Sequence, residues 1–259
     1  MRISFASVVG ALTLFAGGTV SANEAGHAAW AREAGNEIAN VASLQRGARN
    51  FTNYCAGCHS VKYMRYSRIC QDLHIAEDQC ASFLLPPGRK PTDYLKAAMP
   101  AADAQEWFGK PPPDLSLVAR SRGADWVFNF LTTFYADPAS RQTGVNNLQL
   151  PATAMPHVLA SLQGVQVLHV AAEQHEQEAG AEGAGHEAAK APIFDAGIAG
   201  SLTPQQYDEF VRDTVNFLDY VSDPTQVERQ SIGLWVVLFL LMFTGVAYML
   251  KKEYWKDVR

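Results

Sequence analysis

The sequence contains Cys55-Ala56-Gly57-Cys58-His59, a C-x-x-C-H pattern that is typical of covalent c-type haem attachment. Two cysteines three positions apart on a helical turn reach the two vinyl groups of one haem, and the adjacent histidine then points its imidazole at the iron. A chain with only four cysteines and seven histidines rarely produces this pattern by chance. The motif therefore predicts one covalently bound haem c, held by Cys55 and Cys58, with His59 as an iron ligand.

Two other readings of the cysteine pair are a redox dithiol and half of a zinc site. A thioredoxin-like dithiol requires a βαβ context, which the sequence lacks. A zinc site requires further ligands at suitable spacing, and the remaining cysteines, Cys70 and Cys80, are ten positions apart. In an exported chain these two are free to form a disulfide worth about 2–3 kcal/mol, although spacing alone leaves their pairing open.

The sixth iron ligand decides between electron transfer and ligand chemistry, because Met or His there closes the site. The candidates are Met64, Met99 and Met155. Met64 is too close in sequence to His59 to reach the opposite haem face easily. Met155 lies in a turn-rich segment, so spacing favours it over Met99, which stands before Pro100. For Arg120, spacing alone favours a solvated helix end over a bond to a haem propionate.

Both ends of the chain carry membrane signals. Arg2 followed by an uncharged apolar run that ends in small residues predicts a signal peptide at 1–22, cleaved after Ala22. A second uncharged run of about 19 residues is long enough to cross a bilayer as a helix, here assigned to 230–250. Lysines and an arginine follow it, so the positive-inside rule places 251–259 in the cytoplasm.

The part between these signals, 23–226, is predicted to be a mainly α-helical domain on the outer face of the membrane. Apolar spacing predicts helices over 33–52 and 93–99, an irregular stretch over 62–91, and an apolar helical stripe over 117–134 that is interrupted by Gly123.

The last exported helix starts from a capping signal, because Thr203 and Pro204 are followed by Gln206, and it ends at Asp223. Residues 171–191 lack large apolar side chains and are predicted to form a flexible acidic insertion. Its glutamates suggest attraction of a basic electron acceptor. The net charge of −5 argues against a nucleic-acid partner.

Four stretches in this order resemble the cytochrome c1 family, in its bacterial form. They are Arg46-Gly47 leading to the 55–59 motif, Pro112-Pro113-Asp114-Leu115-Ser116 leading to Ala119-Arg120, then Ala154-Met155-Pro156, and finally the helix after Thr203-Pro204 that leads to the anchor. The resemblance implies that His59 and Met155 are the axial iron ligands. It also implies that Arg120 pairs with a haem propionate and that Pro112 packs against the haem.

The resemblance further implies an electron-transfer subunit of ubiquinol–cytochrome c oxidoreductase, an enzyme only as a complex. Its partners would be cytochrome b, a Rieske iron–sulfur protein that delivers electrons and a cytochrome c that accepts them, in a dimeric complex of the bacterial inner membrane. The alternative is a membrane-tethered haem sensor or peroxidase with an open iron site, for which His74 and His157 are available.

Overall fold

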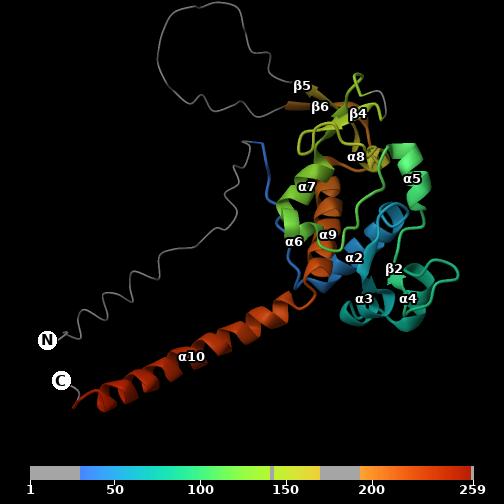
Figure 1. Ribbon diagram of the computed structural model, residues 1–259. Helices are drawn as coiled ribbons and strands as arrows, with labels where there is room; N and C mark the ends of the chain where they lie inside the picture. Colours follow the sequence, from blue (N-terminus) through green and yellow to red (C-terminus); the bar gives the residue numbers. More distant parts are fainter. Residues whose placement is uncertain (1–29, 141–142, 170–192, 258–259) are drawn as a thin grey trace, which may run out of the picture. The chain divides into compact units, whose positions relative to one another are not determined.

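A computed structural model describes residues 30–140, 143–169 and 193–257 (Figure 1). The predicted signal peptide and the acidic insertion at 171–191 lie outside the described residues. The described chain is mainly helical, as predicted, with helices α2 (Val41–Tyr54), α3 (Tyr66–Asp72), α4 (Glu77–Phe83), α5 (Ala101–Phe108), α6 (Val118–Arg122), α7 (Ala124–Thr132), α8 (Ala160–Gln163), α9 (Pro204–Ser222) and α10 (Gln226–Tyr254).

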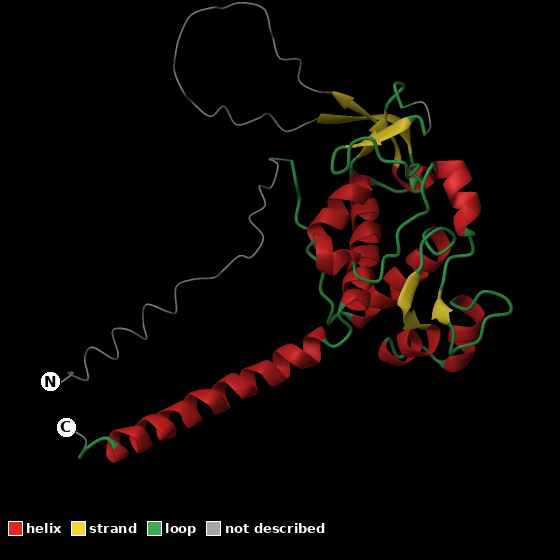
Figure 2. Ribbon diagram, in the orientation of Figure 1, coloured by secondary structure: helices red, strands yellow, loops and turns green. Residues whose placement is uncertain are grey.

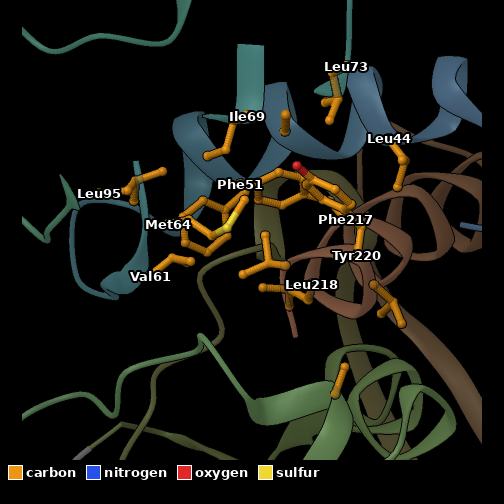
Figure 3. Packing of buried hydrophobic residues seen from close by; sticks show 14 of the residues in the cluster. Leu44, Phe51, Val61, Met64, Ile69, Leu73, Leu95, Phe217, Leu218 and Tyr220 are labelled. Carbon is orange, nitrogen blue, oxygen red and sulfur yellow. The ribbon is translucent and has the colours of Figure 1, made fainter. Parts of the chain in front are cut away.

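Helices α2 and α9 pack against each other and form the centre of the core. Gly47 of α2 permits a very close approach, because a Cβ atom built there would lie 2.0 Å from the Asp213 carbonyl oxygen of α9. Beside this contact, the Arg46 side chain donates from Nε to Asp213 Oδ2 at 2.6 Å. Phe51 and Phe217 meet with ring centroids 5.6 Å apart (Figure 3). The contact fixes the helix that leads directly into the Cys55 motif.

Helix α2 is shorter than the predicted helix over 33–52, since it begins only at Val41. The preceding backbone is bonded to α7 instead, where Ala34 N donates to Asp125 Oδ1 at 2.7 Å. Gly35 has a positive φ of 59°, which ends any helical path. Asn40 then caps α2 by accepting from Ser43 N at 3.1 Å.

The apolar stripe over 117–134 breaks at Gly123 as predicted, giving α6 and α7. Helix α9 starts with the predicted capping box between Thr203 and Gln206 and ends at Ser222, with Asp223 as its C-cap. Tyr207 ties α9 to α7 by donating its buried hydroxyl to the Leu131 carbonyl at 2.8 Å.

Three antiparallel two-stranded ribbons were not predicted (Figure 2). They are β1 (Val61–Arg65) with β2 (Tyr94–Leu95), β3 (Phe134–Ala136) with β4 (Val145–Asn147), and β5 (Gly164–His169) with β6 (Ile193–Ala199). The predicted helix over 93–99 is wrong, because Tyr94 and Leu95 pair with β1 and Leu95 enters the core.

The stretch 62–91 is not irregular, since it contains β1, α3 and α4. Each of these two helices has only seven residues, which is too short for a clear apolar period. A disulfide between Cys70 and Cys80 joins them, with the Cα atoms 6.0 Å apart. The pairing that the sequence left open is therefore present.

Helix α10 is the one helix in the described residues that is long and apolar enough to cross a membrane. Its mean hydropathy reaches 2.2, and no residue of that window is buried within the protein. It extends beyond the predicted 230–250 at both ends, from Gln226 to Tyr254. Arg229 near its start donates to Asp223 Oδ2 at 2.5 Å, which joins the anchor helix to the end of α9.

Candidate haem site

The Cys55 motif continues directly from the C-terminal end of α2. Phe51 is fully buried in the core (Figure 3). Its carbonyl accepts from Cys55 N at 2.8 Å and from Ala56 N at 2.9 Å. His59 N then donates to the Cys55 carbonyl at 2.8 Å, which closes the motif into a turn. Packing of α2 therefore determines where both thiols and the imidazole lie.

Both cysteines of the motif are free thiols and are half-buried. Burial is the main reason that the pKa of the Cys55 thiol is raised to about 12, with the nearby Cys58 adding to it. A thiol so protonated is a poor spontaneous nucleophile at neutral pH. Burial therefore does not activate Cys55 as a nucleophile.

The His59 imidazole is oriented by a backbone carbonyl. Its Nδ1 lies 2.8 Å from the Pro113 oxygen, and because a carbonyl can only accept, Nδ1 must carry the proton. The neutral ring then presents the lone pair of Nε2, which is the form that binds a metal. Burial lowers the pKa of His59, against the opposing effects of the Pro113 carbonyl and Asp114, so the neutral form is favoured.

The segment around Pro113 is bonded to the last residue of the motif and to the residues that follow it. Leu115 N donates to the Ser60 carbonyl at 2.8 Å, and Lys62 N donates to Asp114 Oδ2 at 3.0 Å. Pro112, predicted to contact the haem, is half-buried and precedes the carbonyl that orients His59. The sequence did not reveal the role of Pro113, because a backbone carbonyl leaves no side-chain signature.

The three candidate methionines lie in different surroundings. Met64 is buried in the hydrophobic core near Val61 and Phe51 (Figure 3). The backbone of Met99 is bonded to the attachment loop itself, with its N–H donating to the Gly57 carbonyl at 3.1 Å. Met155 comes from a separate loop and packs, half-buried, against the core.

The loop that carries Met155 is shaped by asparagine side chains. Asn146 Oδ1 accepts from Ala152 N at 2.8 Å, and Asn147 Nδ2 donates to the Phe130 carbonyl of α7 at 2.7 Å. Ala152 has a positive φ of 57°, unusual for a residue other than glycine. Loops held in this way can present a ligand without helical geometry.

Arg120 lies on α6 with its side chain 64% exposed, and its nearest carboxylate is Asp223 Oδ2 at 3.7 Å. Its neighbour Arg122 stacks over the Trp126 ring, 4.5 Å from the centroid. The long contact leaves the Arg120 guanidinium with spare donors. It does not by itself place Arg120 at a propionate.

The two histidines considered as distal groups of an open iron site, His74 and His157, are not among the residues that contact the Cys55 motif. His74 is exposed in the turn after α3, with a positive φ of 52°. His157 stacks on Phe134 with ring centroids 4.9 Å apart. Burial lowers the pKa of His157 despite opposing bonds from Gly164 and Gln163. Neither histidine is bonded to the attachment motif.

These donors fit a c-type haem. Two unbridged thiols and a neutral imidazole with a free Nε2 come from one loop, and a half-buried thioether comes from another. Together with the mainly helical domain and the apolar helix α10, they are the features expected of a membrane-anchored c-type cytochrome.

Comparison with known proteins gives the family. The Cytochrome C1 family pattern matches residues 30–84 and 87–258. Cytochrome c1 of Allochromatium vinosum is 47% identical over 226 residues, covering 86% of this chain and 87% of that protein. A Nitrosomonas europaea protein named ammonia monooxygenase gamma subunit is 42% identical over 220 residues, covering 85% of each chain. Cytochrome b/c1 of Bradyrhizobium diazoefficiens is 26% identical over 250 residues, covering 83% of this chain and 33% of that protein.

The chain belongs to the cytochrome c1 family. It is accordingly a haem protein of electron transport with a transmembrane helix, as the sequence predicted.

Proposed function

We propose that the chain is the electron-transfer subunit of a ubiquinol–cytochrome c oxidoreductase (bc1) complex, taking electrons from a Rieske iron–sulfur protein and passing them to a cytochrome c. The family supports this role, and the name cytochrome b/c1 of one relative supports cytochrome b as a partner. The subunit makes and breaks no substrate bonds, so it is enzymatic only as part of the complex.

The observation that carries the proposal is the bond between His59 Nδ1 and the Pro113 carbonyl, next to two free thiols. Cys55 and Cys58 would hold one haem covalently, and His59 and Met155 would be its axial ligands. When bound, this haem supplies one-electron redox chemistry, and thioether ligation raises its potential.

The protein's own contribution is to hold and orient these groups. Pro113 fixes the imidazole tautomer, the packing of α2 against α9 fixes the loop, and the loop bonded to α7 presents Met155. Pro112 would pack against the haem. Arg120, whose contact with Asp223 is long, would donate to a propionate.

The membrane arrangement follows from α10. We propose that residues 1–22 are removed as a signal peptide and that residues 23–226 lie in the periplasm. The span at 230–250 lies within α10, and the lysines at its end favour a cytoplasmic location for 251–259 in the bacterial inner membrane. The whole complex would be a dimer.

The test is to purify the full chain from native membranes by a C-terminal tag. The proposal predicts that haem remains on this chain after denaturation, that cytochrome b and a Rieske protein co-purify, and that the complex reduces cytochrome c with a quinol. Replacing Cys55 and Cys58 with serine should abolish the covalent haem, whereas the Cys70→Ser/Cys80→Ser pair should keep it. A complex without quinol-dependent cytochrome c reduction would contradict the proposal.

A further inference from the structure

In the β1–β2 ribbon, two side chains that are adjacent in sequence are both exposed to solvent. Val61 pairs with Leu95 and Arg65 with Tyr94, so β1 carries extra residues opposite a continuous β2. This irregularity leaves Lys62 and Tyr63 both exposed, although they are adjacent in sequence. Bulges of this kind re-aim side chains and are common next to functional sites.

The exposed surface of this ribbon and of the loop before β2 is basic and aromatic. We call it the basic ribbon face, and it consists of Lys62, Tyr63, Arg65, Arg89, Lys90, Tyr94 and Lys96.

Two of its cations lie over its two tyrosines. The Arg65 guanidinium is 4.3 Å from the centroid of the Tyr94 ring, and the Lys62 ammonium is 5.5 Å from that of Tyr63. Exposed aromatic rings beside arginine are the composition that protein interfaces favour.

The cations of this face are not held in close ion pairs. In the part of the chain that the structure describes, none of its five cations has a carboxylate within 4.0 Å. The nearby carboxylates of Asp93 and Asp114 accept from backbone N–H groups, those of Lys90 and Lys62 respectively. A chain with net charge −5 thus carries a local positive surface here.

The face adjoins the haem-attachment loop. Directly after β2, Ala97 N donates to Ser60 Oγ at 2.9 Å and Met99 N donates to the Gly57 carbonyl at 3.1 Å. Gly57 lies between the two attachment cysteines and is exposed. A protein seated on this face would therefore lie beside the loop whose Cys55 and Cys58 would hold the haem.

We propose that the basic ribbon face docks the electron acceptor and that the acceptor presents an acidic surface. This inference rests on the proposed function, and it names the chemistry of the partner at that site. Complementary charge raises the rate of encounter by factors of about 10–10³ at low salt, whereas the aromatic centre supplies contact area. The proposed acidic acceptor differs from the sequence-based expectation that the insertion at 171–191 attracts a basic acceptor. That insertion lies outside the described residues.

The experiment uses the full chain with its haem, reduced and then mixed by stopped flow with a soluble cytochrome c of net negative charge or one of net positive charge. The negative cytochrome should be reduced at least about tenfold faster at low salt, and added salt should slow it. The Lys62→Glu/Lys96→Glu variant should lower that rate about tenfold or more and leave the positive cytochrome's rate equal or higher.

Arg49→Glu is the control for a single charge reversal elsewhere on the surface, because Arg49 is exposed on α2 and lies outside the face. Its rate should stay within about twofold of the unchanged protein at equal salt. Binding of the negative cytochrome with both haems oxidised should weaken in the Lys62→Glu/Lys96→Glu variant, a readout that is independent of electron transfer.

Faster reaction with the positive cytochrome, or equal effects of the ribbon variant and Arg49→Glu, would overturn the proposal. The proposal would also be overturned if the Lys62→Glu/Lys96→Glu variant lost binding to phosphatidylglycerol vesicles and nothing else, because the face would then bind lipid. A normal haem spectrum with no charge preference refutes the docking inference alone. A missing haem spectrum refutes the proposed function and the inference with it.

Discussion

Replacing Gly47 with alanine should destabilise the protein, although alanine favours a helix over glycine. The added Cβ would lie 2.0 Å from the Asp213 carbonyl oxygen and 2.7 Å from Phe217 Cβ, and real Cβ contacts are essentially never closer than 3.0 Å. Helices α2 and α9 must therefore separate by about 1 Å at the centre of the core, by the distances above.

The size of the effect follows from two opposing contributions. Overpacking a core costs about 1–3 kcal/mol and occasionally more, whereas glycine to alanine within a helix gains about 1 kcal/mol. Because the obstacle is backbone and the adjacent Arg46–Asp213 ion pair would be stretched, we expect a cost at the upper end of that range, about 3 kcal/mol, and therefore a net loss of about 2 kcal/mol. At about 2–4 °C per kcal/mol for a domain of this size, Tm should fall by roughly 4–8 °C.

The assay is thermal unfolding of the full chain in detergent, followed by circular dichroism. Gly245→Ala is the control, because it makes the same change in helix α10, where a Cβ would meet nothing within 4 Å. The control should leave Tm unchanged or raise it by up to about 4 °C. If Gly47→Ala unfolds at the same or a higher temperature than the unchanged protein, the close approach of α2 and α9 is refuted.

Three further perturbations have defined outcomes. Cys70→Ser/Cys80→Ser should lower the free energy of unfolding by about 2–3 kcal/mol in urea titration, and an unchanged midpoint would contradict a formed disulfide. Tyr207→Phe should cost about 1–3 kcal/mol by the same titration, because it leaves the buried Leu131 carbonyl without its donor; a neutral result would mean that water replaces the hydroxyl. Burial raises the folded-state pKa of Asp219 above its ordinary value of 3.8. The charged carboxylate therefore lowers the stability of the fold at pH values above the raised pKa, and this loss of stability vanishes below pH 3.8, where the carboxyl is protonated in both states. Asp219→Asn should therefore raise Tm at about pH 8 and change it less at about pH 3. The opposite pH trend would be inconsistent with a raised pKa.

Features encoded within a few consecutive residues could be predicted from the sequence. The Cys55 motif, the capping box at Thr203 and the break at Gly123 each rely on contacts within one turn of chain. The membrane helix has a similarly local signal in its uninterrupted apolar run.

Features that depend on distant partners could not be predicted. The residues before Val41 are not helical, and Asp125, far along the chain, accepts the Ala34 N–H there. Strand β2 has only two residues, so no alternating pattern can identify it. The group that orients His59 is a backbone carbonyl, which the one-letter sequence does not distinguish.

The most direct test of a closed haem site with His59 and Met155 is the absorption spectrum of the reduced protein before and after addition of carbon monoxide. The account predicts no change for the unchanged protein and for Met99→Ala, and formation of a carbonyl complex for Met155→Ala. Carbon monoxide binding by the unchanged protein would instead indicate an open iron site and favour a sensor or peroxidase. Binding by Met99→Ala but not by Met155→Ala would contradict Met155 as the ligand.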